Sequence, residues 1–210
     1  MNSADQPDIS DTSKTYLALG DSYTIGESVS AADRFPDQAV SLLRARNIKI
    51  NDPKIIATTG WTTQDLINAL DADPLKNNYD IVSLLIGVNN QYQGRSIDEY
   101  KIEFTLLLNR AIRYAGNNAM HVFVLSIPDY SVTPFAQNAD GAKISEEIDQ
   151  FNSVNKMISS QLGANYIDIT PISREVKNDP SLIAGDGLHP SGKQYGLWTR
   201  LLVRAIGNRQ

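Results

Sequence analysis

Short apolar segments alternate with longer segments of helical periodicity along most of this chain. An alternation of this kind is typical of β–α units that build a parallel sheet. The apolar segments are nearly continuous, as expected for strands that helices cover on both faces. Five parallel strands are therefore predicted, at residues 15–20, 54–58, 81–86, 121–127 and 165–169.

The longer segments carry apolar residues three and four positions apart, which predicts helices. Thr62 with Asp65, and Ser96 with Glu99, have the spacing of capping boxes at two of the helix starts. Strands and helices in this order predict an α/β protein, a three-layer α/β/α sandwich around a five-stranded parallel sheet. The predicted helices span residues 35–47, 62–71, 96–115, 142–162 and 197–206.

The length of 210 residues is that of a single domain. The first 14 residues are polar and acidic, so residues 1–14 are predicted to be a disordered tail and residues 15–210 one domain. No signal peptide is visible in this tail, which fits either the start of a cytoplasmic protein or a spacer left after an export signal is removed. Residues 128–141 form a long irregular segment after the fourth strand, where a ligand crevice is expected.

Composition excludes several classes of function. Nineteen basic and 24 acidic residues give a net charge of −5, which argues against a nucleic-acid-binding protein. The absence of cysteine excludes disulfides, thiolate metal sites and a cysteine nucleophile. Only His121 and His189 offer imidazole, so zinc sites with two or three histidines are nearly excluded. The apolar runs are far shorter than the roughly 20 residues that span a bilayer.

The first candidate for chemistry is Ser22, which follows the first predicted strand directly after Gly20 and Asp21. A serine at this junction projects into the crevice above the sheet, and the glycine allows a sharp turn of the chain. Backbone amides that follow the strand point to where an anion would develop. The alternative interpretation is structural, since Asp21 and Ser22 are both favoured helix-capping residues.

The second candidate is the pair Asp186 and His189, which lies in a glycine- and proline-containing loop near the C-terminus. A separation of three residues lets the carboxylate reach the imidazole Nδ1 and leaves Nε2 free to act as a base. A serine nucleophile needs such a base, and the base needs an anionic group to orient it. His121 begins a predicted buried strand and is therefore interpreted as structural.

Two further positions offer hydrogen-bond donors for an oxyanion. Asn89 follows the third predicted strand and has a side-chain amide, and Gly60 follows the second strand with an unobstructed backbone N–H. The alternative interpretation of each residue is an ordinary turn, and for Gly60 taken alone the turn is the preferred interpretation. Because the carboxyl ends of parallel strands share one edge of the sheet, all these candidates are expected to converge on one crevice.

In their order and spacing these segments resemble the four sequence blocks of the SGNH hydrolases, also called GDSL esterases and lipases. Two positions depart from the family pattern, because Tyr23 replaces the leucine of the name-giving motif and Asn90 stands where aspartate is frequent. The second departure affects the hydrogen bonds that hold the turn. The matching segments are GDSYT at 20–24, Gly60, GVNN at 87–90 and DGLHPS at 186–191.

The resemblance implies a flavodoxin-like fold and hydrolysis of carboxylic esters through an acyl-enzyme. By position it makes Ser22 the nucleophile, His189 the general base and Asp186 the residue that orients it. It also implies an oxyanion hole formed by the Ser22 N–H, the Gly60 N–H and the Asn89 side chain. No metal or organic cofactor is expected.

The leading hypothesis is a serine esterase whose partner is a small-molecule ester with a small or medium acyl group. One alternative is a carbohydrate O-acetyl esterase of the same family, and another is a non-catalytic binding module that kept the fold. A nucleotide-binding protein is disfavoured because no GxGxxG or GxxxxGK[ST] motif follows a predicted strand. The sequence specifies neither acyl length, nor the alcohol, nor the oligomeric state. Trp61, Tyr92, Tyr130 and Phe135 are candidates for contact with the acyl group.

Overall fold

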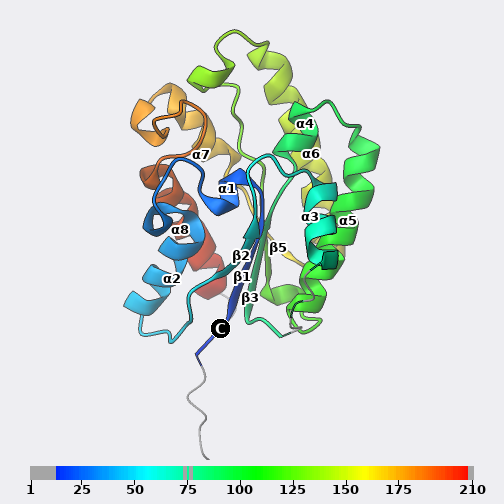
Figure 1. The fold of residues 1–210 in the computed structure, drawn as a ribbon, viewed down its shortest axis with the longest axis vertical. Helices are drawn as coiled ribbons and strands as arrows, with labels where there is room; N and C mark the ends of the chain where they lie inside the picture. The colour runs from blue at the N-terminus through cyan, green and yellow to red at the C-terminus, as the bar shows by residue number, and fades with distance from the viewer. Residues whose placement is uncertain (1–12, 73–74, 76–77, 208–210) are drawn as a thin grey trace, which may run out of the picture.

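Five parallel strands form the sheet at the centre of the molecule, in the order β2–β1–β3–β4–β5 (Figure 1). This computed structural model describes residues 13–72, 75 and 78–207. Most of the tail predicted at residues 1–14 lies outside the described residues, whereas Lys14 forms an isolated bridge with Ile50. The strands are β1 (Tyr16–Gly20), β2 (Lys54–Ala57), β3 (Ile81–Leu85), β4 (Val122–Leu125) and β5 (Asn165–Ile167).

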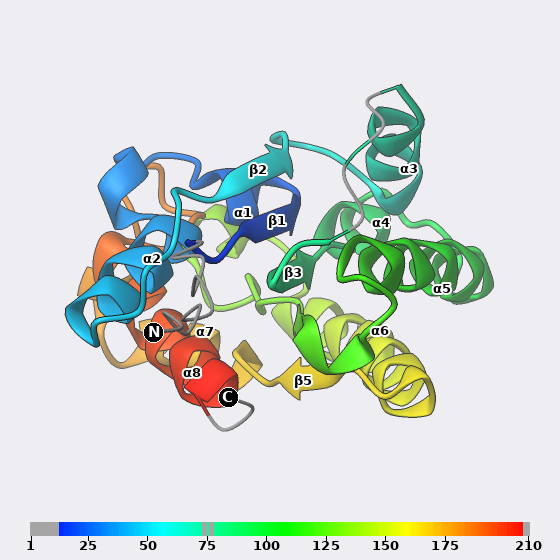
Figure 2. The same ribbon diagram turned by 90° about the horizontal axis from the view of Figure 1, so that it is seen from below.

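Helices cover both faces of this sheet, which confirms the predicted three-layer α/β/α sandwich. Figure 2, seen along the strands, places α2 and α8 on one side and α3, α5 and α6 on the other. The long helices are α2 (Phe35–Ala45), α3 (Thr63–Ala72), α5 (Ile97–Tyr114), α6 (Gly141–Leu162) and α8 (Gly192–Gly207). Short helices are α1 (Ser22–Ile25), α4 (Val88–Tyr92) and α7 (Thr170–Arg174), with 3₁₀ turns at Ala31–Asp33, Ala119–His121, Pro134–Ala136, Glu175–Lys177 and Pro180–Leu182.

The core forms where the apolar strands meet the apolar stripes of the helices. All residues of β1, β3 and β4 are buried, as expected for strands enclosed on both faces. On one side Trp198 of α8 is fully buried, and on the other side so are Leu107 and Leu108 of α5. Burial of these stripes removes apolar surface from water, at roughly 25 cal/mol per Å².

The start signals of two helices act as the sequence predicts. At α3, the Thr62 N–H and hydroxyl both donate to the Asp65 carboxylate, at 2.9 and 2.6 Å. At α5, the Ser96 hydroxyl accepts the Glu99 N–H at 3.1 Å. These bonds satisfy backbone and side-chain groups that the first turn of a helix leaves without intrahelical partners.

Several boundaries differ from the prediction. The last helix begins at Gly192 and not at residue 197, because glycines at 192 and 196 weaken the helical pattern although tertiary packing of α8 on α2 accommodates both. The fourth strand begins at Val122, and His121 is a partly exposed residue of the preceding 3₁₀ turn. The helices α1, α4 and α7 were not predicted, because one-turn helices are too short to show a periodic pattern.

The strand register brings three chain segments to one level of the sheet. Gly20 at the end of β1 pairs with Ala57 at the end of β2 and with Leu85 at the end of β3. The residues that follow these three ends therefore emerge side by side at the edge where α1 and α4 lie (Figure 1). The residues singled out for chemistry follow these ends.

Gly20 is required by close packing and not by a left-handed turn. Its φ is not positive, which corrects the expectation that its conformational freedom is what the turn needs. A Cβ at this position would lie 2.1 Å from Thr24 Oγ1 and 2.4 Å from the Leu85 backbone oxygen. Glycine thus lets α1 fold back tightly on the ends of β1 and β3.

We expect Gly20→Ala to destabilise the protein by roughly 1–3 kcal/mol or more, because the new methyl group collides with backbone that cannot move freely. Urea denaturation followed by circular dichroism measures the change in the free energy of unfolding. Gly185→Ala is the matched control, since nothing lies within 4 Å of a Cβ there and its φ is not positive. Equal stability of the two variants would contradict this explanation.

Candidate active site

Ser22 is the first residue of α1 and stands directly above the end of β1. Asp21 caps this helix, because its carboxylate accepts the Tyr23 N–H at 3.0 Å. The capping and the catalytic interpretations of this segment are therefore compatible, since Asp21 caps and Ser22 lines a cavity. Among the described residues, neither the hydroxyl nor the N–H of Ser22 has a hydrogen-bond partner.

Asp21 is a buried carboxyl group beside this serine, with no exposed surface. Burial raises its pKa to about 7, and hydrogen bonds from backbone N–H groups, including that of Tyr23, oppose this rise only in part. Its Oδ2 atom has no hydrogen-bond partner among the described residues. Asp21 consequently changes its charge close to neutral pH.

His189 is held in one orientation by Asp186. The imidazole Nδ1 lies 2.6 Å from Asp186 Oδ2, and the backbone N–H groups of Leu188 and His189 each donate to Asp186 Oδ1 at 3.0 Å. His189 is nearly buried, and the ring of Tyr23 packs beside its ring with centroids 5.4 Å apart. Because Nδ1 is engaged by the carboxylate, Nε2 is the nitrogen left for proton transfer.

The pKa of Asp186 is shifted in the opposite direction to that of Asp21. Partial burial acts to raise its pKa, but the hydrogen bonds from the His189 ring, the Leu188 N–H and the Ser28 hydroxyl outweigh burial and hold the pKa well below its usual value. Asp186 is therefore ionised at neutral pH. A permanent negative charge next to Nδ1 stabilises a protonated imidazole.

The two residues predicted to offer further donors to an oxyanion lie on neighbouring segments. Gly60 lines the cavity, with a φ of +84° and open space around the position of a Cβ. Asn89, on α4, donates one amide hydrogen to the Trp61 backbone oxygen at 2.9 Å, which holds its side chain and leaves the second hydrogen free. Both residues line the same cavity as Ser22.

Asn90, where the family pattern often has aspartate, ties α4 to the start of α3. Its Oδ1 accepts the Thr63 N–H at 3.0 Å, and its Nδ2 donates to the Thr63 hydroxyl at 2.6 Å. Both residues are fully buried. The amide thus makes the hydrogen bonds that hold the Gly60 segment against the Asn89 segment.

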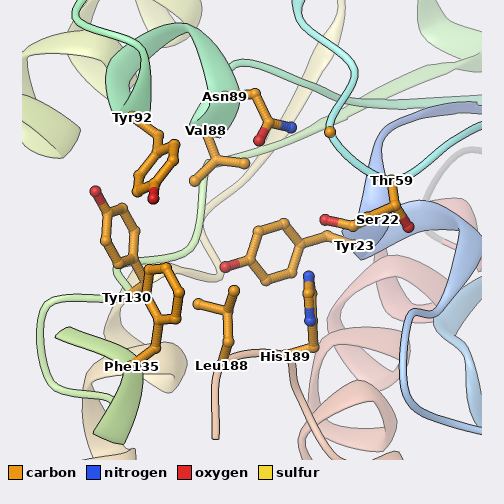
Figure 3. Close-up of a pocket in the computed structure, with 11 residues that line it drawn as sticks. Ser22, Tyr23, Thr59, Val88, Asn89, Tyr92, Tyr130, Phe135, Leu188 and His189 are labelled. Carbon is orange, nitrogen blue, oxygen red and sulfur yellow. The ribbon is translucent and has the colours of Figure 1, made fainter. Parts of the chain in front are cut away.

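The cavity has a volume of about 150 Å³ and extends from Ser22 to a group of aromatic side chains (Figure 3). Tyr92, Tyr130 and Phe135 form its far end, with ring centroids 6.0–6.3 Å apart. Tyr130 and Phe135 belong to the segment predicted to line a crevice. The cavity is lined by Ser22, Tyr23, Thr59, Gly60, Val88, Asn89, Tyr92, Tyr130, Phe135, Leu188 and His189.

The structure brings the candidate residues together as the sequence predicts. Ser22, Gly60, Asn89 and His189 line one cavity, and Asp186 lies behind His189. No hydrogen bond joins the Ser22 hydroxyl to the imidazole in the described residues, and such bonds often tighten only when substrate binds. Trp61 does not line the cavity.

Other lining residues were not singled out from the sequence, among them Thr59, Val88 and Leu188. They are ordinary apolar or turn residues in the sequence, and only their adjacency to the candidate motifs could have indicated them. His121 lies at the opposite edge of the sheet, beside Lys14 and Ile81 at the strand beginnings. Within the described residues no cluster of three His, Asp or Glu side chains forms a metal site, and no helix is long and apolar enough to cross a membrane.

Comparison with known structures finds the same fold in several proteins, esterases among them. An acetyl xylan esterase variant from Geobacillus stearothermophilus, Axe2-W215I, superposes with a TM-score of 0.69 at 22% identity and covers 92% of this chain and 94% of its own. TesA superposes with a TM-score of 0.72 at 14% identity, covering 94% and 100%. The esterase EstA from Pseudoalteromonas sp. gives 0.68 at 18% identity, covering 93% and 97%. The search of curated proteins gave no match.

A parallel sheet with a cavity at its carboxyl edge is the arrangement in which α/β proteins bind ligands at their strand ends. Residues 18–197 match the model of the GDSL-like lipase/acylhydrolase family, and this chain belongs to that family. The protein is therefore a carboxylic ester hydrolase, as the resemblance in the sequence implied. The predicted family and fold class are both confirmed.

We expect Asp21 to make stability depend on pH. Its pKa is raised in the folded protein, so folding favours the protonated form, and this contribution is complete below about pH 4 and is lost as the pH rises through about 7. Relative to Asp21→Asn, which keeps an acceptor for the Tyr23 N–H, the wild type should lose up to about 4 kcal/mol over this range. Urea titrations at a series of pH values measure it. Parallel stability curves for the two proteins would show that Asp21 does not titrate there.

Proposed function

We propose that this protein is a serine esterase that hydrolyses esters of small or medium acyl groups through an acyl-enzyme on Ser22. The observation that carries the proposal is the cavity that Ser22 shares with His189, whose Nδ1 is bonded to the ionised Asp186. Two N–H groups and one amide side chain border the same cavity, at Ser22, Gly60 and Asn89. A nucleophile, an oriented base and oxyanion donors are the groups that acyl transfer requires.

The reaction follows from these positions. His189 Nε2 accepts the hydroxyl proton while Ser22 Oγ bonds to the ester carbonyl carbon, and the carbonyl electron pair moves to the oxygen held by the donors. As the C–O bond to the alcohol breaks, the alcohol leaves with the proton from Nε2. Water then adds to the acyl carbon and gives a proton to His189. The bond to Ser22 Oγ breaks, Oγ takes the proton back, and the carboxylic acid is released.

We expect Ser22→Ala to abolish ester hydrolysis and Asn89→Ala to lower kcat by about 10²–10³-fold, because the first removes the nucleophile and the second one oxyanion donor. Initial rates with an aryl acetate measure both effects. Asn109→Ala, an exposed position on α5, is the control and should keep full activity. A wild-type rate in Ser22→Ala would refute the assignment, and failure of an organophosphonate to label Ser22 would favour the non-catalytic binding module.

The cavity supports a short acyl group. A volume of about 150 Å³ is similar to that of an engineered protein cavity that binds benzene, so roughly six carbon atoms fit. The rings of Tyr92, Tyr130 and Phe135 line the cavity on the side away from Ser22 (Figure 3). Tyr130 is buried, whereas Tyr92 is 61% and Phe135 49% exposed. The end of the cavity therefore combines one buried ring with two rings at the surface.

We expect kcat/KM for aryl esters to fall beyond an acyl chain of about six carbons, because a longer chain meets the three rings. Tyr92→Ala and Phe135→Ala should each extend the cavity and move the optimum to longer chains. Ile102→Ala is the control, since this side chain is exposed on α5 and does not line the cavity. An unchanged chain-length profile in both aromatic variants would show that the acyl group lies elsewhere.

A carbohydrate O-acetyl esterase is the second candidate function. The small cavity suits an acetyl group, and the exposed rings of Tyr92 and Phe135 are the kind of surface on which a sugar ring stacks. One structural neighbour is described as an acetyl xylan esterase. Rates on an acetylated xylooligosaccharide and on an aryl acetate, measured in parallel, separate the two: strong preference for the sugar favours the deacetylase.

A further inference from the structure

Ser28 connects the beginning of the chain to the loop that carries His189. Its hydroxyl donates a hydrogen bond of 2.7 Å to Asp186 Oδ2, across 158 positions of sequence. It lies in the turn that follows α1, outside the segments that indicated chemistry in the sequence. The same oxygen of Asp186 binds the imidazole Nδ1 of His189.

The hydrogen bonds to the Asp186 carboxylate are donated from two separate parts of the chain. The Leu188 N–H, the His189 N–H and the His189 ring all belong to the loop of Asp186 itself. The Ser28 hydroxyl adds a donor from a separate part of the chain, the segment that continues from the helix of Ser22. This bond therefore joins the side of the site that holds the serine to the side that holds the base.

Ser28 adopts a backbone conformation that serine seldom takes. Its φ is +65°, in the left-handed region, which strains a residue with a Cβ. Glycine would occupy this position without strain but would bring no hydroxyl group. Strained residues of this kind persist where surrounding structure holds them, and they concentrate at functional sites. Hydrogen bonds from Glu27 N–H to the Ser22 oxygen and from Val29 N–H to the Gly26 oxygen hold this turn.

We propose that Ser28 is a positioning residue for ester hydrolysis, which holds the Asp186 carboxylate in place and sets how strongly it attracts the proton on His189. This inference rests on the proposed function. A hydroxyl that donates to Oδ2 takes up part of the negative charge that would otherwise act on the imidazole. Without it, the carboxylate turns more freely and attracts the imidazolium more strongly, so less neutral base is present at neutral pH.

Other titratable groups lie near the Asp186–His189 pair, and their charges must be told apart from the effect of the Ser28 hydroxyl. Burial raises the pKa of Tyr23 and the pKa of Tyr195, so both phenols stay uncharged. The pKa of Asp21 is about 7, so this carboxyl group titrates near neutral pH, where the imidazole is to be followed. The two titrations must therefore be separated. The titratable groups on the elements packed around the pair are Asp21 and Tyr23 beside Ser22, Glu27 of the turn, Asp129 and Tyr130 after β4, and Tyr195 of α8.

Two substitutions at Ser28 separate the hydroxyl from the backbone strain. Ser28→Ala removes the hydroxyl and keeps the strain, whereas Ser28→Gly removes both, so Ser28→Gly should be the more stable of the two. If the hydroxyl is what matters, both variants lose about three- to tenfold in kcat with KM little changed, whatever their melting temperatures. Ser28→Asn, which tolerates a left-handed φ and carries a donor, should recover part of the rate.

The direct readout is NMR of the imidazoles in histidine-labelled protein. The chain has two histidines, so His121 serves as an internal reference in the same spectrum. We expect the titration midpoint of His189 to move to higher pH in Ser28→Ala and Ser28→Gly, together with the acid limb of kcat/KM, while His121 stays unchanged. Repeating the titration with Asp21→Asn in both the wild-type and the Ser28→Ala background removes the overlapping carboxyl.

Each outcome decides the proposal. Wild-type kcat and an unmoved His189 midpoint in both variants would overturn it, and so would a loss of rate that follows melting temperature and is absent in Ser28→Gly. The NMR titration needs no turnover, so it separates this proposal from the proposed function. An inactive wild type whose His189 midpoint still responds to Ser28 would refute esterase activity and the role of Ser28 in hydrolysis, but would keep its coupling to the Asp186–His189 pair.

Discussion

The parallel pairing of β1 with both β2 and β3 is the constraint on which the rest of the site depends. Because Gly20, Ala57 and Leu85 end their strands at one level, the next few residues of each segment emerge within reach of one another. Backbone hydrogen bonds across the sheet hold this register, and a slip of one residue would turn every side chain of a strand to the other face. The donors at Gly60 and Asn89 thus stand beside Ser22 without a long loop to place them.

The two carboxyl groups near the cavity show how their surroundings separate chemically identical side chains. Asp21 is fully buried, and in the part of the chain that the structure describes one of its oxygens has no hydrogen-bond partner, so burial dominates and raises its pKa. Asp186 is partly open and accepts four hydrogen bonds, so these dominate and lower its pKa. Asp186 is therefore charged beside the imidazole at neutral pH, whereas Asp21 titrates near neutral pH. Such divergence is frequent in enzyme sites that carry out acid and base chemistry near neutral pH.

Much of this protein could be predicted from local patterns, and the errors have identifiable causes. The apolar segments predicted all five strands, and the spacing of Ser96 with Glu99 predicted the start of α5. The start of α8 was wrong because its glycines are tolerated only through packing against α2. Gly20 was recognised as necessary for the wrong reason, since the clash it avoids involves Leu85, 65 residues away in the sequence.

By itself the sequence determined the order of strands and helices, the family, and the residue types at the candidate site, because periodicity and short motifs are local properties. The tertiary structure alone decided the rest: the volume of the cavity, its lining by Tyr92, Tyr130 and Phe135, and the hydrogen bond from Ser28 to Asp186. These features depend on atoms that are distant in sequence and meet only when the sheet has formed. Contacts of that kind leave no periodic pattern along the chain, since their geometry arises from packing.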